Sequence, residues 1–83
     1  MLKYDTVDNL VEKYQKSVAG FVRKKVDDEG VVEELTQDIL YAAYKAWPSF
    51  SGKSSEFSFI CGIANHKITD YYRKKKLKTI LFS

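Results

Sequence analysis

Residues 30–48 read GVVEELTQDILYAAYKAWP, and their pattern indicates what kind of domain this chain forms. Apolar residues recur every three or four positions, which predicts a helix. They form two stripes, and a helix with two apolar stripes usually lies between two neighbouring elements. One stripe is Val32, Leu35, Ile39, Ala42 and Ala46, and the other is Leu40, Tyr44 and Trp47. We therefore expect a central helix that ends at Pro48.

Two further helical patterns flank this central segment. Before it, apolar residues at spacings of three and four predict a helix from residue 7 to about residue 26. After it, residues 57–72 show the same period, and Ser54 or Ser55 can cap the start of that helix. The chain is therefore predicted to be all-α, a compact bundle of three long helices with one extra short helix as an option.

Length and composition agree with a single globular domain. The chain has 83 residues, of which 45% are hydrophobic and 30% charged, which excludes a disordered tail. No apolar run approaches the roughly 18 residues that span a bilayer, and the opening residues lack a signal-peptide pattern. One cysteine, Cys61, cannot form an intrachain disulfide. We therefore expect a protein of the reducing cytoplasm.

The residue types that carry catalysis or bind metals are sparse. The single histidine, His66, follows Cys61 by five residues and falls on another face of the same helix, so the two do not form a nucleophile and base pair. One cysteine and one histidine make no zinc site. The acidic residues between 27 and 38 lack the spacing of a calcium loop. We expect no enzyme activity, metal, cofactor or small-molecule substrate.

Charge is distributed unevenly along the chain. Residues 1–64 hold eight Lys and Arg against ten Asp and Glu, giving −2, whereas residues 65–83 hold six against one, giving +5. Six acids between Asp27 and Asp38 have no basic residue among them. A helix gains little from such a run because like charges repel. The asymmetry suggests two charged partners, and the acidic run suggests a basic protein.

The basic third helix and the loop before it each allow two interpretations. Cations, tyrosines, Asn65 and His66 suit phosphates, exposed bases and base edges, but a solvated helix end with two core tyrosines has the same composition. In the loop, Phe50 is either an aromatic anchor for a plain connection or the floor of a shallow pocket for a flipped base or a phosphate.

Taken in order, these motifs resemble conserved region 2 of bacterial sigma factors, and most closely the extracytoplasmic-function (ECF) type. The resemblance covers roughly residues 7–76. The stretches that carry it are Glu34–Leu40, Ala43–Trp47, Phe50–Ser55, Phe59-Ile60, Ile63-Ala64 and Asp70–Arg73. Each motif is weak alone, but their order and spacing together are specific.

The resemblance implies a domain that docks on the clamp helices of core RNA polymerase and opens the −10 promoter element, capturing its non-template strand. The implied polymerase-binding residues are Glu34, Leu35, Gln37, Asp38, Tyr41 and Lys45. The implied DNA-binding residues are Phe50, Lys53, Ser54, Ser55, Asn65, His66, Lys67, Asp70, Tyr71, Arg73, Lys74 and Lys75. An anti-sigma factor is a further implied partner. Residues 1–76 would form the region 2 domain, and 77–83 would begin a linker to an absent region 4 domain, as in a fragment of a longer factor.

Two positions depart from the family pattern. Phe59 stands where the family often has Trp, and His66 stands where it often has Asn, with Asn65 one position early. Two other classes of function stay open beside the resemblance. One is a generic helical interaction domain whose basic end is a solvated tail. The other is an amphipathic helix on an anionic membrane, which is disfavoured because the core already needs the apolar face of the third helix.

Overall fold

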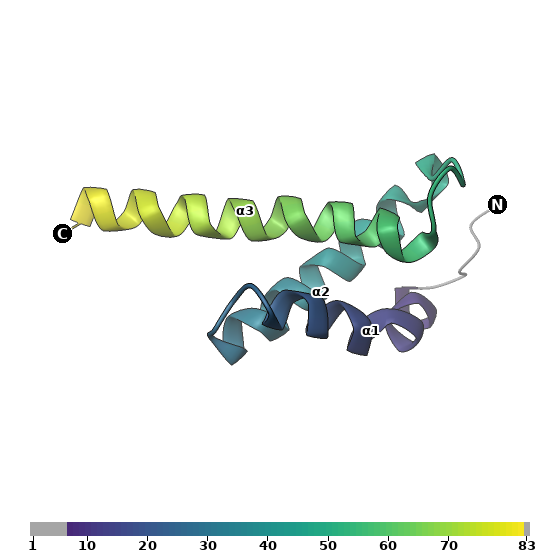
Figure 1. Cartoon of the computed structure of the whole chain (residues 1–83), viewed down its shortest axis with the longest axis horizontal. Coiled ribbons are helices and arrows are strands. Elements are labelled where there is room, and N and C mark those ends of the chain that lie inside the picture. Colours follow the sequence, from purple (N-terminus) through teal and green to yellow (C-terminus); the bar gives the residue numbers. More distant parts are fainter. Residues whose placement is uncertain (1–6, 83) are drawn as a thin grey trace.

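The computed structural model describes residues 7–82, which form three long helices and one short helical turn (Figure 1). Helix α1 spans Val7–Arg23, α2 spans Glu29–Ala46, the 3-10 turn η1 spans Trp47–Ser49, and α3 spans Glu56–Phe82. Residues 7–82 contain no strand. The prediction of an all-α fold with three long helices and one short helix is confirmed.

Local chemistry explains where α2 begins and ends. Asp28 has extended backbone angles, and its carboxylate accepts the backbone N–H of Val31 at 3.2 Å, so it is the N-cap. At the other end, Pro48 cannot continue an α-helix, and the chain tightens into η1. The observed start of α2 at Glu29 lies one residue before the start expected near Gly30.

The core forms where α2 packs against both α1 and α3. This arrangement confirms the prediction that the helix with two apolar stripes is central. Fully burying a valine, leucine or isoleucine side chain stabilises a fold by about 1.5–3 kcal/mol. The buried hydrophobic residues are Leu10, Val18, Val22, Val26, Val32, Leu35, Ile39, Leu40, Ala43, Trp47, Ile60, Ala64 and Ile68.

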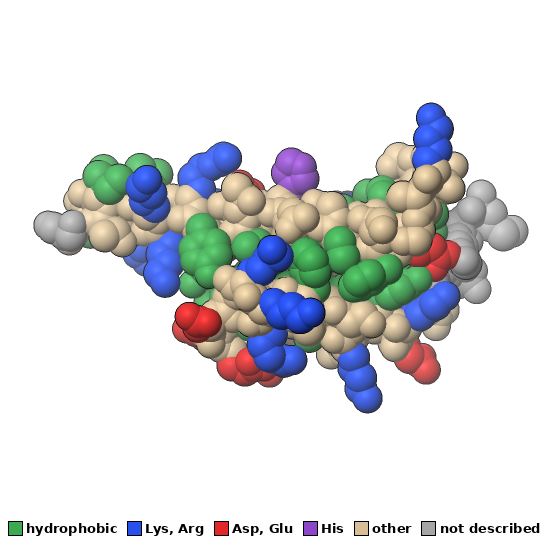
Figure 2. Space-filling model, viewed as in Figure 1, with side chains coloured by type: hydrophobic (Ala, Val, Ile, Leu, Met, Phe, Trp, Pro, Cys, Tyr) green, Lys and Arg blue, Asp and Glu red, His purple; other side chains and the backbone are tan. Residues whose placement is uncertain are grey.

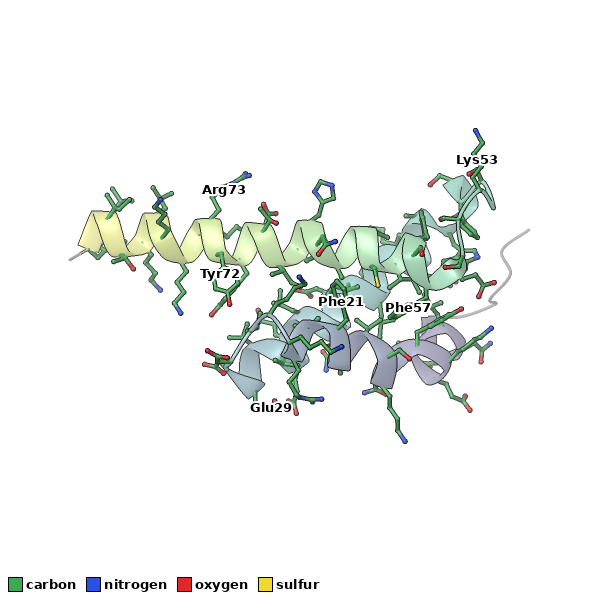
Figure 3. All side chains as sticks on the ribbon, viewed as in Figure 1. Phe21, Glu29, Lys53, Phe57, Tyr72 and Arg73 are labelled. Atoms are coloured by element: carbon green, nitrogen blue, oxygen red, sulfur yellow. The ribbon has the colours of Figure 1, made fainter. Side chains whose placement is uncertain are left out.

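Contacts at two points fix α3 to the α1–α2 layer. Near its start, Glu56 accepts a hydrogen bond from the hydroxyl of Tyr14 and lies 3.5 Å from Lys13 Nζ. Further along, the hydroxyl of Tyr72 donates to the backbone carbonyl of Lys25, in the turn between α1 and α2. The labelled Tyr72 side chain reaches down from α3 toward that turn (Figure 3). The two contacts are 16 residues apart along α3, so they set its direction across the layer.

The far end of α3 extends past the other helices (Figure 1). Residues 77–82 are helical and exposed, and they extend the third helix beyond the pattern of residues 57–72. Extending a helix that tertiary packing has already nucleated fixes only one residue per added hydrogen bond, and no Gly or Pro interrupts this segment. The assignment of 77–83 as the start of a linker stays a prediction, and Ser83 lies outside the described residues. Within residues 7–82, no helix has the length and apolar character needed to cross a membrane.

Candidate functional site

One face of α2 carries most of the residues expected to bind polymerase. Glu34, Gln37, Asp38, Tyr41 and Lys45 are all exposed, and their spacing of three and four puts them on one side of the helix. We call these five residues the α2 stripe. Lys45 Nζ lies 5.3 Å from the ring centroid of Tyr41, which links two of them.

Leu35, the sixth residue expected to bind polymerase, differs from the other five. Its side chain is only 8% exposed and belongs to the hydrophobic core. The sequence could not show whether Leu35 is a core residue or a surface residue. The two apolar stripes of α2 leave only a narrow polar face, and Leu35 lies three residues before Asp38 at the edge of that face.

The acidic run is only partly compensated. Glu29 accepts two hydrogen bonds from the Arg23 guanidinium, at 2.7 and 3.2 Å, and this partner lowers the pKa of Glu29 and raises that of Arg23. Glu33, Glu34 and Asp38 form no ion pair within residues 7–82. Negative charge therefore concentrates on α2 at and beside the α2 stripe.

A second surface lies on the side of α3 that faces away from α1 and α2. Asn65, His66, Thr69 and Arg73 line a shallow groove there of about 240 Å³. The labelled Arg73 points away from the bundle, and the chain's one histidine projects from the same side (Figures 2 and 3). We call these four residues the outer α3 face. Thr69 was not predicted, although its spacing of three and four from His66, Asn65 and Arg73 could have identified it.

All the other α3 candidates except Lys75 turn toward α2. Together with α2 residues they line a second groove, of about 190 Å³, which we call the α2–α3 groove. Arg73 Nη1 lies 3.9 Å from Asp70 Oδ1, so an ion pair joins the two faces. The candidates predicted to bind DNA are therefore split between two faces of the helix. The residues that line the α2–α3 groove are Glu34, Leu35, Asp38, Lys67, Asp70, Tyr71 and Lys74.

Lys75 lies next to this groove and belongs to neither face. Its ammonium group is 5.9 Å from the centroid of the half-buried Tyr71 ring. Lys75 and Tyr71 also line a small hollow with Lys74 and Lys78. This part of α3 is basic, because no acidic residue follows Asp70.

The loop before α3 is anchored by aromatic packing. The ring centroid of Phe50 lies 5.4 Å from that of Trp47 and 4.9 Å from that of Phe59, and the Trp47 and Phe59 rings meet edge to face at 5.5 Å. Such ring pairs stabilise a fold beyond their buried area. Phe50 thus packs as an anchor for the loop, with Phe59 as the third ring of the cluster, and the interpretation of the loop as a pocket for a base stays a prediction. Gly52, with φ of +79°, then lets the chain turn back toward α3.

The polar loop residues divide into capping and accessible groups. Ser55 accepts the backbone N–H of Ser58 at 3.1 Å and donates to its hydroxyl at 2.9 Å, so Ser55 is the N-cap of α3. Ser54 donates to the Ser55 carbonyl at 3.3 Å. The labelled Lys53 extends away from the helices at the tip of the loop (Figure 3). Lys53 and Ser54 are therefore better placed than Ser55 to meet a ligand.

Comparison with known proteins gives a consistent result. A family profile described as Sigma-70 region 2 matches residues 10–78. The ECF RNA polymerase sigma factor SigX of Bacillus subtilis (strain 168) is 28% identical over 72 residues, covering 87% of this chain and 37% of the relative. The RNA polymerase sigma factor YlaC of the same organism is 24% identical over 70 residues, covering 84% and 40%. The chain thus spans about two fifths of these relatives. No solved structure gives a significant match.

Proposed function

The chain belongs to the Sigma-70 region 2 family, and we propose on that ground that it docks on core RNA polymerase and captures the non-template strand of the −10 promoter element. Both events are binding events with no covalent step. The cost of unstacking bases, a few kcal/mol, would be offset by stacking and phosphate contacts.

The observation that carries this proposal is the separation of two surfaces of different chemistry. The α2 stripe is acidic and exposed, whereas the outer α3 face and the basic end of α3 offer cations and base-reading side chains. A domain that holds a protein and a nucleic acid together needs both surfaces free at once. The α2 stripe and the outer α3 face lie on different helices, which supports simultaneous binding, and the two sets of residues meet at the α2–α3 groove.

On the polymerase side, the proposed contact is the α2 stripe against the clamp helices. Glu34 and Asp38 are exposed and form no ion pair within residues 7–82, so they can meet cations on a partner. Leu35 supports this surface from the core. An anti-sigma factor remains a predicted partner, and we assign it no residue.

On the DNA side, the proposed contacts fall in two groups. Asn65, His66 and Arg73 on the outer α3 face would meet bases and backbone, and Lys67, Lys74 and Lys75 would meet phosphates. Lys53 and Ser54 at the loop tip would contact one extruded base above the Phe50 anchor. The His66 contact is the least supported, because His66 departs from the family pattern.

A salt titration tests the proposal. The chain is bound to core polymerase, and fluorescence anisotropy measures its affinity for a labelled −10 non-template oligonucleotide and for the complementary strand. We expect tighter binding of the non-template strand. Lys74→Ala with Lys75→Ala should weaken binding to all sequences about equally. The salt slope should flatten by up to about one unit for each phosphate that the variant no longer neutralises.

The matched control replaces two exposed lysines in and just after α1, Lys16→Ala with Lys24→Ala. This pair removes the same charge from a surface with no assigned role, so it should leave strand preference and salt slope unchanged. Equal affinity for both strands, or binding that ignores salt, would instead favour a generic interaction domain.

A further inference from the structure

A groove of about 330 Å³ runs between α1 and α2, and the residues that line it come from these two helices only. The labelled Glu29, at one end of the groove, lies on the far side of the α1–α2 layer from α3 (Figure 3). Apart from Gln37, which also belongs to the α2 stripe, none of its residues has been assigned to polymerase or DNA. We call it the α1–α2 groove. Its lining includes Gln15, Ala19, Val32, Glu33, Thr36 and Gln37.

Thr36 lies at the bottom of the α1–α2 groove, because it is only 4% exposed, whereas Gln15 and Gln37 are exposed at the sides. Its hydroxyl forms no hydrogen bond within residues 7–82. A threonine inside a helix often bonds to the carbonyl four residues earlier, here that of Val32, but this bond is not made. A buried hydroxyl without a partner is costly, and valine would fill the same space without that cost. An occupant that reaches the bottom of the groove would supply the missing partner.

The groups around this hydroxyl are mostly acceptors of hydrogen bonds. Glu33 is exposed and forms no ion pair within residues 7–82. The guanidinium of Arg23, at one end of the groove, already donates two hydrogen bonds to Glu29, so its charge is matched. Gln15 and Gln37 add an amide oxygen from each helix. Among the lining residues, an occupant therefore meets one uncompensated negative charge and three neutral oxygens.

We propose that the α1–α2 groove receives an arginine side chain from an extended segment of a basic protein partner. A guanidinium carries five N–H donors in one plane and no acceptor, so it can bond to several of these oxygens at once. Ala19 and Val32 are small and apolar, which suits the aliphatic stem of the arginine. The volume is near the lower end of the range for ligand pockets, about 300–1,000 Å³, which suits one side chain and the backbone beside it.

Chemistry favours this occupant over the other candidates. A phosphate or a carboxylate would be repelled by Glu33 and would meet mostly acceptors. A lysine ammonium would be attracted, but it is a compact charge with three donors and lacks the planar fork. A free guanidine compound would satisfy the oxygens, but it would leave the N–H groups of Gln15 and Gln37 without the backbone carbonyls that a peptide supplies.

Two-dimensional NMR of the full 83-residue chain tests the proposal, because the chain has only two glutamines and both line the groove. The probes are the blocked tripeptides Gly-Arg-Gly and Gly-Lys-Gly, and ethylguanidine, all with the same charge. We expect Gly-Arg-Gly to shift the side-chain amide signals of Gln15 and Gln37 saturably, with a Kd in the millimolar range. Gly-Lys-Gly and ethylguanidine should bind severalfold more weakly. The side-chain amide of Asn65, on the outer α3 face, is the internal control and should not shift.

Variants of Thr36 separate binding from stability. Thr36→Val keeps the shape and removes the hydroxyl, so it should raise Tm and weaken Gly-Arg-Gly binding by about two- to tenfold, the value of one hydrogen bond. Thr36→Ser keeps the hydroxyl and should bind nearly as wild type. Glu33→Gln should weaken binding and reduce its salt dependence. Glu12→Gln, the matched control, removes the same charge from an exposed position on α1 outside the groove and should leave binding unchanged. Circular dichroism verifies the fold of each variant.

Three outcomes would overturn the proposal. The first is that Gly-Arg-Gly leaves the two glutamine signals in place or shifts the Asn65 signal equally. The second is that Gly-Lys-Gly or ethylguanidine binds as tightly as Gly-Arg-Gly. The third is that Thr36→Val raises Tm but leaves binding unchanged, which would give the hydroxyl no role in the groove. None of these measurements includes polymerase or DNA, so failure here is distinguishable from failure of the proposed function.

Discussion

At the scale of single residues, Tyr72 joins parts of the chain that are far apart in sequence. Its hydroxyl donates to the carbonyl of Lys25, 47 residues earlier, and its ring packs edge-on against Tyr71 at 5.1 Å. The neighbouring Tyr71 is half-buried, and its hydroxyl makes no hydrogen bond within residues 7–82. The two adjacent tyrosines thus have different roles. Tyr72 tethers α3 through the hydrogen bond of its hydroxyl, whereas Tyr71 contributes through the packing of its ring.

Removing the Tyr72 hydroxyl should therefore cost more stability than removing that of Tyr71. We expect Tyr72→Phe to lower the free energy of unfolding by about 0.5–1.5 kcal/mol, because the Lys25 carbonyl loses its donor. Tyr71→Phe is the matched control and should change it by less than about 0.5 kcal/mol. Urea denaturation followed by circular dichroism measures both, and equal effects would contradict the tether.

Ser54 and Ser55 form a second contrasting pair. Sequence alone allowed either serine to cap α3, and the family resemblance implied a DNA contact for both. The Ser55 hydroxyl is engaged with Ser58, whereas Ser54 makes one longer bond to a backbone carbonyl. Stability and ligand binding should thus respond to different serines.

Ser55→Ala should lower the free energy of unfolding by about 0.5–2 kcal/mol, as removal of an N-cap does. Ser54→Ala should leave stability nearly unchanged and, if the loop contacts an extruded base, should weaken capture of the non-template strand. Thermal unfolding and anisotropy measured on the same two variants give both quantities. A destabilised Ser54→Ala variant, or an unaffected Ser55→Ala variant, would reverse the assignment.

At the scale of elements, α2 combines two roles on opposite sides. Its buried side forms the centre of the core, and its outer side carries the α2 stripe. Because these sides share no residue other than the supporting Leu35, charge on the stripe can be changed without disturbing packing. This separation makes the proposed polymerase contact testable by charge reversal.

Glu34→Lys with Asp38→Lys should weaken binding to core RNA polymerase and leave helical circular dichroism intact. The physical reason is repulsion between the new cations and a basic partner surface. Glu12→Lys with Glu33→Lys makes the same change in net charge at exposed acids outside the stripe and should bind nearly as wild type. Pull-down of core polymerase compares the two, and equal recovery of both variants would remove the stripe from the interface.

The loop between η1 and α3 has two candidate roles, a pocket for an extruded base or a plain connection between helices. Phe50 and Ser55 fix its two ends, while Gly52, Lys53 and Ser54 between them are exposed. A segment fixed at both ends can be exchanged at its tip with little effect on the core.

Replacing residues 51–54 with those of an ECF sigma factor such as SigX should change base preference at one promoter position by about 1–3 kcal/mol, with stability little affected. Keeping Ser55 preserves the cap. Selection from a randomised −10 library in the assembled holoenzyme measures the preference. An unchanged preference at every position would mean that the loop is only a connection between helices.

At the scale of the whole molecule, sequence periodicity predicted the helices far better than it predicted their surfaces. The two stripes on α2 identified the central helix, because burial on two sides leaves a direct trace in the sequence. Periodicity could not divide the α3 candidates between two faces, since that division depends on how α3 crosses α2. The pairing of Tyr14 with Glu56 was equally hidden, because contacts between residues 42 apart follow from helix packing rather than from local pattern.

The uninterrupted length of α3 has a mechanical consequence. Its 27 residues form a rod of about 40 Å, held by the core around Ala64 and by Tyr72, and residues 73–82 beyond these contacts are exposed. A tilt of about 5° about Ala64 would move the tip at Phe82 by about 2 Å, because roughly 27 Å of helix lies between them. A small change in how α3 packs around Ala64 therefore produces a larger displacement at Phe82. The hydrogen bond from the Tyr72 hydroxyl to the Lys25 carbonyl lies between Ala64 and residues 73–82, so it limits how far this segment of α3 can tilt.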